Sequence, residues 1–279
     1  MKKLLFLGAA SVFLWTGCEK AQLNKETTTT EDHAVAEVAF EELKLSFDEH
    51  ADAIGDTASI DTTGTDSTVV SSCPTKTWTP EWNTLEGFFK FPKTIRIDFG
   101  DGCVGRDGKE RKGVIVGTYT DWPWKVNATL TIVPENYYVD DYWVEGVKEY
   151  RYLGRNLQGN HRWHVEVSDG LVITPDGAKI TWESERENEL IQGGDDFDPT
   201  NNVYSITGEA RGTNRDERAF EAMIKEALII KAGCPNITKG VLDITPEELK
   251  TRSVDYGDGS CDDDAVVTIG NKSYEIKLR

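Results

Sequence analysis

The chain has 279 residues, and its 31 basic and 49 acidic side chains give a formal net charge of −18 at neutral pH. An apolar fraction of 38%, with 10% aromatic residues, excludes a disordered chain and allows one large β domain or two small ones. The acidic excess argues against nucleic acid as a partner and disfavours docking on an anionic membrane through surface charge. Both need lysine and arginine to neutralise phosphate groups.

The first residues have the pattern of an export signal. Residues 1–3 form a short basic start, Leu4 to Trp15 is an apolar run, and Gly17 precedes Cys18. An apolar run of this length is too short to span a bilayer, and small residues before a cut are typical of a secretory leader. We therefore predict a signal peptide over residues 1–17.

The cysteine directly after Gly17 resembles the bacterial lipobox, although Trp15 stands where that motif usually has leucine. In lipoproteins with this motif the cysteine is acylated on sulfur, the chain is cut before it, and the new amine is acylated. The resemblance implies a palmitate-type membrane anchor at Cys18, stabilised by about 0.8 kcal/mol per buried CH₂. An ordinary signal peptide with an incidental cysteine is the alternative.

Acylation of Cys18 leaves an even number of cysteines in an oxidising compartment, where disulfides persist. Four cysteines allow three pairings. We prefer Cys73–Cys103 and Cys234–Cys261, which close loops of 30 and 27 residues. By the chain-entropy model each such loop is worth roughly 3–4 kcal/mol. Reduced, buried thiols are the alternative.

A lipidated polar spacer over residues 18–30 leads to a predicted amphipathic helix over residues 31–54, which Gly55 ends. Its apolar residues recur at three- and four-residue steps: Ala36, Phe40, Leu43, Phe47, Ala51 and Ile54. This narrow stripe predicts packing on the main domain or weak self-association. His33 and His50 on this segment are expected to be solvated rather than to bind a metal.

From residue 55 to 72 the composition changes to glycine, aspartate, serine and threonine, which is typical of a flexible linker. Three triplets in it resemble the Asp-Ser/Thr-small-or-apolar acceptor motif for O-glycosylation in Bacteroidetes-type lipoproteins. The resemblance implies Thr57, Thr62 and Ser67 as acceptors. Chance matches in a serine- and threonine-rich stretch are the alternative.

Residues 73–279 are predicted to form a β-rich globular domain. Val126, Ala128, Leu130 and Ile132 alternate with polar residues, as in a half-buried strand, and similar runs recur along the domain. Short strands at roughly ten-residue spacing, without helical periodicity between them, favour an antiparallel meander or sandwich-like sheet over βαβ units. The fold class is therefore mainly β, preceded by a short helix and a linker.

One segment of this domain has conflicting signals. Residues 218–231 are rich in helix formers, whereas Phe220, Ala222 and Ile224 alternate with polar residues. We predict a strand there.

Two turns near the ends of this domain are similar to each other. Residues 98–102 read Asp-Phe-Gly-Asp-Gly before Cys103, and residues 255–259 read Asp-Tyr-Gly-Asp-Gly before Cys261. Glycine suits a tight turn and aspartate accepts hydrogen bonds from local amides, which favours a structural role.

Calcium binding is the alternative interpretation of the second turn, with Asp255, Asp258 and Asp262 as ligands. The spacing of these residues does not match an acidic calcium loop. We therefore expect neither a metal nor another cofactor.

Several short strings across the mature chain are specific in combination: Phe91-Pro92-Lys93-Thr94, Arg111-Lys112-Gly113, Asn136-Tyr137-Tyr138-Val139, Ile206-Thr207-Gly208, Gly212-Thr213-Asn214-Arg215 and Gly257-Asp258-Gly259-Ser260-Cys261-Asp262. With the Asp-Phe-Gly-Asp-Gly turn, they resemble a family of uncharacterised Bacteroidetes-type exported lipoproteins. The resemblance implies a β-rich exported domain and a strand near Phe220. It brings no known activity, so no catalytic residue is implied.

No nucleophile elbow, phosphate-binding loop, dinucleotide fingerprint or His-Glu-x-x-His motif occurs in the sequence. Glu183 and Glu185 are two residues apart on one predicted strand, so both carboxylates share a face and could serve glycoside hydrolysis. In a chain with 49 acidic residues such a pair arises by chance. We therefore expect a protein that is not an enzyme, with a glycosidase-like enzyme on a β-sandwich as the alternative.

Aromatic residues are the stronger functional indication. Most are expected in the core. Trp122 and Trp124 flank Pro123 and form a predicted exposed pair, which suits a sugar ring or a partner protein. We therefore expect a lipid-anchored outer-membrane protein of the cell envelope, periplasmic or surface-facing, that binds a glycan or envelope proteins. No nucleic-acid partner is expected.

Overall fold

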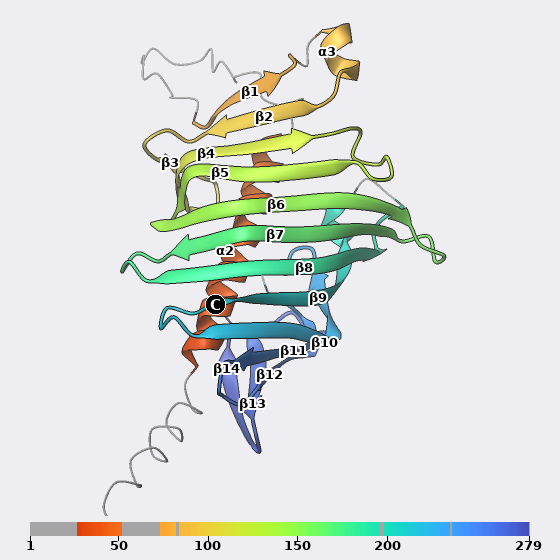
Figure 1. Ribbon diagram of the computed structural model, residues 1–279. Coiled ribbons are helices and arrows are strands. Elements are labelled where there is room, and N and C mark those ends of the chain that lie inside the picture. Colours follow the sequence, from red (N-terminus) through yellow and green to blue (C-terminus); the bar gives the residue numbers. More distant parts are fainter. Residues whose placement is uncertain (1–26, 52–72, 82–83, 196–197, 235, 279) are drawn as a thin grey trace, which may run out of the picture.

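The computed structural model describes residues 27–51, 73–81, 84–195, 198–234 and 236–278. Its β strands form one 14-stranded sheet whose order follows the sequence, except that β3 pairs with β4 outside the main path (Figure 1). Neighbouring strands are antiparallel, so the architecture is the predicted mainly β meander. The strand predicted near Phe220 is also present, as β10.

The strands are β1 (Thr75–Thr79), β2 (Lys93–Asp98), β3 (Cys103–Val104), β4 (Glu110–Tyr119), β5 (Thr129–Val139), β6 (Tyr142–Arg155), β7 (His161–Ile173), β8 (Lys179–Gln192), β9 (Val203–Thr213), β10 (Ala219–Lys231), β11 (Lys239–Pro246), β12 (Arg252–Asp258), β13 (Asp264–Ile269) and β14 (Lys272–Lys277). The helices are α2 (Thr28–Ala51), α3 (Leu85–Phe89) and the 3₁₀ turn η1 (Pro199–Asn201). The predicted helix over residues 31–54 thus begins three residues earlier, and its predicted last residues, Ile54 among them, lie outside the described residues.

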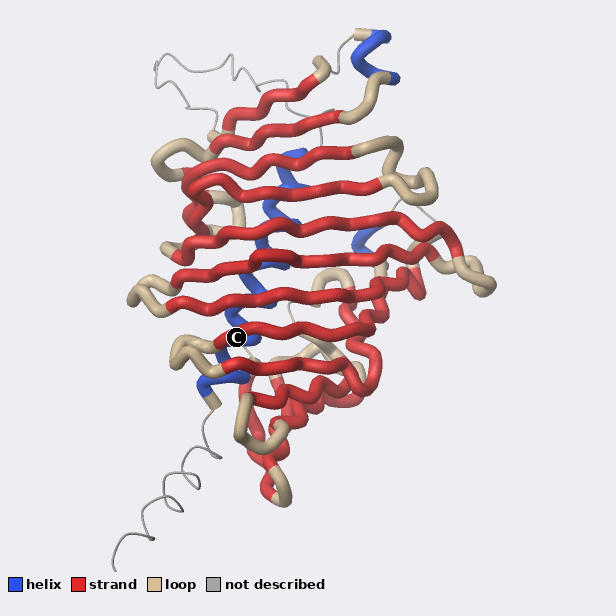
Figure 2. The backbone as a smooth tube through the Cα atoms, in the orientation of Figure 1, coloured by secondary structure: helices blue, strands red, loops and turns tan. Residues whose placement is uncertain are grey.

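Helix α2 crosses one face of the sheet, and Figure 2 shows it passing behind successive strands. Its predicted apolar stripe packs on the sheet, since Ala36, Phe40, Leu43 and Phe47 are fully buried. The Phe40 ring stacks on Trp182 of β8 with centroids 5.5 Å apart. Burying each of the larger side chains contributes roughly 1.5–3 kcal/mol, so the stripe is the main apolar attachment of α2.

A glycine allows the close approach of α2 to the sheet. A Cβ atom on Gly117 of β4 would lie only 2.1 Å from the Phe47 ring. No real side chain fits in that space, so glycine at this position determines how deeply α2 sits.

Ion pairs also join α2 to the sheet and its turns: Asp32–Arg215, Glu37–Arg186, Glu41–Lys148, and Glu42 with both Arg111 and Lys109. Asp32, Arg111, Lys148 and Arg186 are buried. Charges removed from water are stabilising only when they are paired and hydrogen-bonded. In each of these pairs the helix supplies the carboxylate, and a strand or a turn of the sheet supplies the cation.

The prediction that His33 is solvated is wrong. Its side chain is 1% exposed, and its Nδ1 atom accepts a hydrogen bond from Trp182 Nε1 at 3.1 Å. His50 is half-buried, with Nδ1 2.8 Å from the Ser46 carbonyl oxygen. The sheet buries a wider part of the α2 surface than the apolar stripe predicted from the sequence, and His33 lies in this additional part.

Both preferred disulfides are present, with Cα–Cα distances of 5.9 Å for Cys73–Cys103 and 5.8 Å for Cys234–Cys261. The first joins the start of β1 to β3, and the second joins the β10–β11 connection to the β12–β13 connection.

Several predicted features lie outside the described residues: the leader over 1–17, Cys18, most of the spacer, and the linker with Thr57, Thr62 and Ser67. In the part of the chain that the structure describes, no helix has the length and apolar character needed to span a membrane.

Candidate functional site

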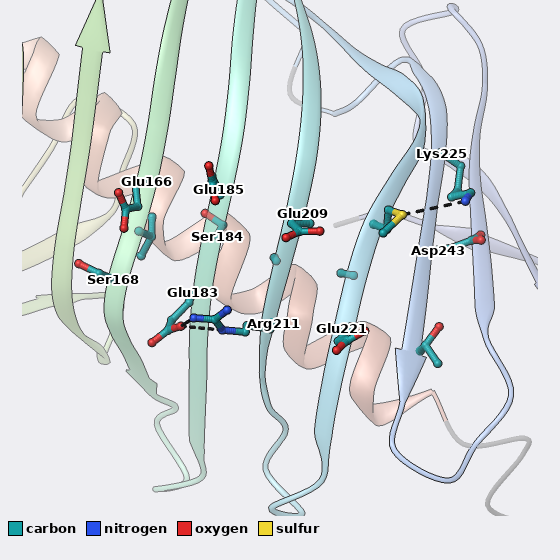
Figure 3. A pocket seen from close by; sticks show the side chains of 15 residues that line it. Glu166, Ser168, Glu183, Ser184, Glu185, Glu209, Arg211, Glu221, Lys225 and Asp243 are labelled. Atoms are coloured by element: carbon teal, nitrogen blue, oxygen red, sulfur yellow. Dashed lines mark hydrogen bonds and ion pairs between the residues drawn. The ribbon is translucent and has the colours of Figure 1, made fainter. Parts of the chain in front are cut away.

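The sheet face opposite α2 carries the predicted carboxylate pair. Glu183 and Glu185 of β8 lie on this open face, as their spacing predicts, and Figure 3 shows them with side chains from neighbouring strands. Glu183 is not free, because its Oε2 atom accepts hydrogen bonds from Arg211 Nε at 2.8 Å and Nη2 at 2.5 Å. The Glu185 side chain is 70% exposed to water.

A row of glutamates runs across this open face. The register places Glu149, Glu166, Glu185 and Glu209 opposite one another on β6, β7, β8 and β9. Like charges directly opposite on neighbouring strands destabilise a sheet. The cavity there has a volume of about 500 Å³, and Arg211 is among its few basic residues. The row makes the face strongly acidic without forming an enclosed catalytic cleft.

The predicted aromatic pair lies at one end of the sheet, in the β4–β5 connection. The Trp122 ring is stacked on Trp124, with centroids 5.2 Å apart and planes at 20°. Phe88 and Phe91 also contact Trp122, at 5.3 and 5.1 Å, so this indole is half-buried rather than exposed as expected. Trp124 is 68% exposed, so it offers one indole face to a partner.

A groove between α2 and the sheet has a volume of about 390 Å³. Its sheet wall is aromatic: Tyr119, Tyr150, Tyr152, Trp163 and Tyr204. Leu45 and three charged residues of α2 form the opposite wall, and Pro123 forms the edge nearest the aromatic pair. A cavity of this size, mostly apolar with a few polar groups, is typical of a small-molecule site.

Strand alternation explains why the aromatic rings gather in the groove. Tyr150 and Tyr152 are two residues apart on β6, so both face α2, and Trp163 on β7 is the register partner of Tyr152. The sequence predicts that Trp163 points inward and His164 outward, and the structure agrees, since His164 lies on the open face 4.0 Å from Glu185. The groove as a whole escapes sequence reasoning because it depends on where α2 crosses the sheet.

Ion pairs hold both carboxylates of the groove. Asp48 accepts a hydrogen bond from Lys44, and Glu41 Oε1 is 2.7 Å from Lys148 Nζ. The Lys44 ammonium also lies 5.0 Å from the centroid of the Tyr150 ring, as a cation–π contact. Each carboxylate of the groove thus has a cation as its direct partner.

Neutral donors and an unused acceptor complete the groove. Burial raises the pKa of Tyr150 well above its ordinary value, and the carboxylates of Glu41 and Asp48 raise it further. Burial likewise raises the pKa of Tyr204. The Asn188 Oδ1 atom is buried at the groove and has no hydrogen-bond partner among the described residues. A ligand hydroxyl would satisfy this acceptor, because a buried polar atom without a partner costs about 1–3 kcal/mol.

The aspartates considered for calcium form local turns. Asp258 Oδ1 accepts hydrogen bonds from the Ser260 backbone amide at 3.0 Å and the Ser260 hydroxyl at 2.8 Å. Asp255 and Asp262 each accept from the backbone amide two residues further along the chain. Within the described ranges, no group of three or more His, Cys, Asp or Glu side chains is placed to hold a metal ion.

Comparison with known protein families found no matching family model, and neither curated proteins nor solved structures gave a match to this chain.

Proposed function

We propose that this chain is a lipid-anchored protein of the cell envelope that binds a glycan in the groove beside α2 and does not transform it. The observation that carries this proposal is the aromatic sheet wall with a buried, unused acceptor at Asn188. Sugar rings present C–H faces that pack on aromatic rings and hydroxyls that satisfy polar atoms at the rim.

The glycan extends from the groove toward the aromatic pair. Pro123 borders the groove and lies between Trp122 and Trp124 in the chain. The residue pair expected from the sequence thus becomes the edge of a larger site. We expect Trp163 and Tyr150 to contact the sugar ring that lies inside the groove.

The envelope location is supported by the leader, by the lipobox resemblance at Cys18 and by the two disulfides, which are typical of an oxidising compartment. We also propose that the chain is related to the exported Bacteroidetes-type lipoproteins that its short sequence strings resemble. Binding without turnover is supported by the paired carboxylates of the groove, Glu41 and Asp48, and by the Arg211 contact of Glu183.

A glycan array followed by titration calorimetry with the full chain tests this function. We expect binding of at least one oligosaccharide, and a loss of about tenfold or more in affinity when Trp163→Ala removes a groove wall. Asn188→Leu replaces the unused acceptor with a side chain of similar size and is expected to weaken binding comparably.

Trp143→Ala is the matched control, because Trp143 is a half-buried tryptophan of β6 that does not line the groove. The Trp143→Ala variant is expected to bind the glycan with the same affinity as the unaltered chain. The proposal fails if no glycan binds, or if Trp143→Ala and Trp163→Ala weaken binding equally. Mass spectrometry of the recovered glycan is expected to show the intact molecule, and cleavage would contradict binding without turnover.

A further inference from the structure

One end of the sheet carries large apolar side chains in water. Figure 1 shows α3, the β4–β5 connection and the β6–β7 connection at the right-hand end of the strands. The exposed residues there are Leu85 (81%), Phe89 (64%), Trp124 (68%), Val126 (56%) and the fully exposed Leu157. We call this set the apolar end.

Three separate segments contribute to the apolar end. Phe88, next to Phe89 in α3, packs on Trp122, which is stacked on Trp124. Val126 lies against Gly154 near the end of β6, where a Cβ atom would be 3.2 Å from its Cγ2 atom. Leu157 follows in the β6–β7 turn. Exposed apolar groups gathered in this way mark an interaction surface rather than scattered surface residues.

The opposite end of the same strands is polar and acidic. Its exposed hairpin turns contain Asp107-Gly108, Asp140-Asp141, Asp176-Gly177 and Asp216-Glu217, and Val104 is the exposed apolar exception. Ordinary hairpin turns are polar at both ends of a sheet, because turn residues face water. The contrast indicates that the two ends of this sheet meet different surroundings.

We propose that the apolar end inserts into the interfacial layer of a lipid bilayer with uncharged or zwitterionic headgroups. Leucine, phenylalanine and tryptophan at loop tips enter that layer, where an indole finds both apolar contact and hydrogen bonds. A protein partner would need a matching groove for three separate tips, whereas a bilayer accommodates them individually.

Charge selects the kind of bilayer and the orientation. Lys90, Lys125 and Arg155 flank the exposed apolar residues, and Lys125 and Arg155 pair there with Asp121 and Asp195. Glu86 and Asp195 are also exposed at this end, and the whole chain carries a net charge of −18, so a strongly anionic surface would repel it. A zwitterionic headgroup carries charges of both signs, so it suits an end that has both cations and carboxylates and adds no net repulsion.

A fluorophore at each end of the sheet tests this proposal in the full chain on vesicles. An environment-sensitive label is attached to Leu157→Cys at the apolar end and, in a matched variant, to Asp176→Cys at the acidic end, with the unsubstituted chain as the labelling background. On phosphatidylcholine vesicles we expect emission at position 157 to shift to shorter wavelength and to be quenched by lipids brominated on the acyl chain. Emission at position 176 is expected to stay unchanged.

Two further arms make the result specific to these side chains. Replacing Leu85 and Trp124 by serine is expected to abolish the shift at position 157, since each fully transferred apolar side chain is worth about tenfold or more in partitioning. The control replaces Val38 and Val104, which are exposed elsewhere, and is expected to keep the shift. Added phosphatidylglycerol is expected to weaken the shift.

Equal emission at the two labelled positions would overturn the proposal, as would a shift that survives the serine changes. Attachment through the N-terminal region alone gives equal emission at both ends, so it also counts against insertion. The readout involves no glycan, so failure here leaves the glycan-binding proposal to its own test.

Discussion

The two faces of the sheet use charge in opposite ways. On the face covered by α2, basic residues of the sheet and its turns pair with acidic residues of the helix, and several of these residues are buried. On the open face, glutamates of four neighbouring strands lie opposite one another in water. The sheet therefore tolerates repulsion where water screens it and requires complementarity where water is excluded.

This difference explains how α2 finds its position. An apolar stripe alone would allow the helix to slide or rotate on a broad, smooth sheet, because apolar contact is not directional. Ion pairs spread from Asp32 near the first turn to Glu42 in the middle fix both its register and its direction. We interpret the buried pairs as positional devices whose net contribution to stability is modest, as is common for charges removed from water.

The largest expected effect comes from breaking one buried pair. Arg111→Met leaves the buried Glu42 carboxylate with only the partly exposed Lys109 as a cationic partner. We expect the free energy of unfolding to fall by about 3–5 kcal/mol, measured by urea denaturation, because an uncompensated buried charge is costly. On the open face, Arg211→Met breaks the exposed pair with Glu183 and is expected to cost about 1 kcal/mol or less.

Adding Glu42→Leu to Arg111→Met separates charge from packing. The double variant is expected to recover most of the lost stability, because an apolar replacement of a buried pair is often neutral. A double variant as unstable as Arg111→Met would show that shape, and not the unpaired charge, causes the loss.

Acid is expected to weaken the covered face before the open one. Burial raises the pKa of Glu37, but Arg186 and a hydrogen bond with His33 lower it more, and the result is about 2 against an ordinary value of 4.5. A lowered pKa stabilises the fold above pH 4.5, and this contribution disappears as the pH falls from 4.5 toward 2. It amounts to about 3 kcal/mol at most.

The measurement compares unfolding of the unaltered chain and of Glu37→Gln at about pH 7 and about pH 2.5. The stability difference between the two chains is expected to shrink at the lower pH. Glu185→Gln on the open face is the control, with a small difference at both values. A difference for Glu37→Gln that is independent of pH would refute the assignment.

A smaller loss is expected when the helix is pushed from the sheet. Gly117→Ala places a methyl group against the Phe47 ring and is expected to cost about 1–3 kcal/mol by overpacking. Combining it with Phe47→Leu provides space, so the two changes together are expected to cost less than the sum of the single changes. Additive losses would mean that this contact does not limit the depth of α2.

Strand alternation, turn chemistry and cysteine spacing are local signals, and the features that depend on them could be predicted. The strand at Phe220, the inward Trp163 and both disulfides belong to this group. The burial of His33 and the groove around Tyr150 could not, because they depend on the path of α2 over strands far away in the sequence. The acidic residues of α2 have the spacing of an ordinary solvated helix face, and nothing local indicates that arginines from the sheet will reach them.

The smallest expected effect is a gain in stability, and it comes from a change on the open face. Glu166 has glutamates opposite it on both neighbouring strands, Glu149 and Glu185. Glu166→Gln removes the central charge of the row and keeps the shape, so we expect a gain of about 0.2–1 kcal/mol at low salt. Denaturation at about 0.01 M and 1 M salt should show the gain disappear, because the Debye length falls from about 30 Å to 3 Å. If the gain in stability persists at high salt, its cause is the strand propensity of glutamine rather than the removal of repulsion. If Glu166→Gln lowers the stability, contacts of Glu166 stabilise the row, and the row is not merely tolerated.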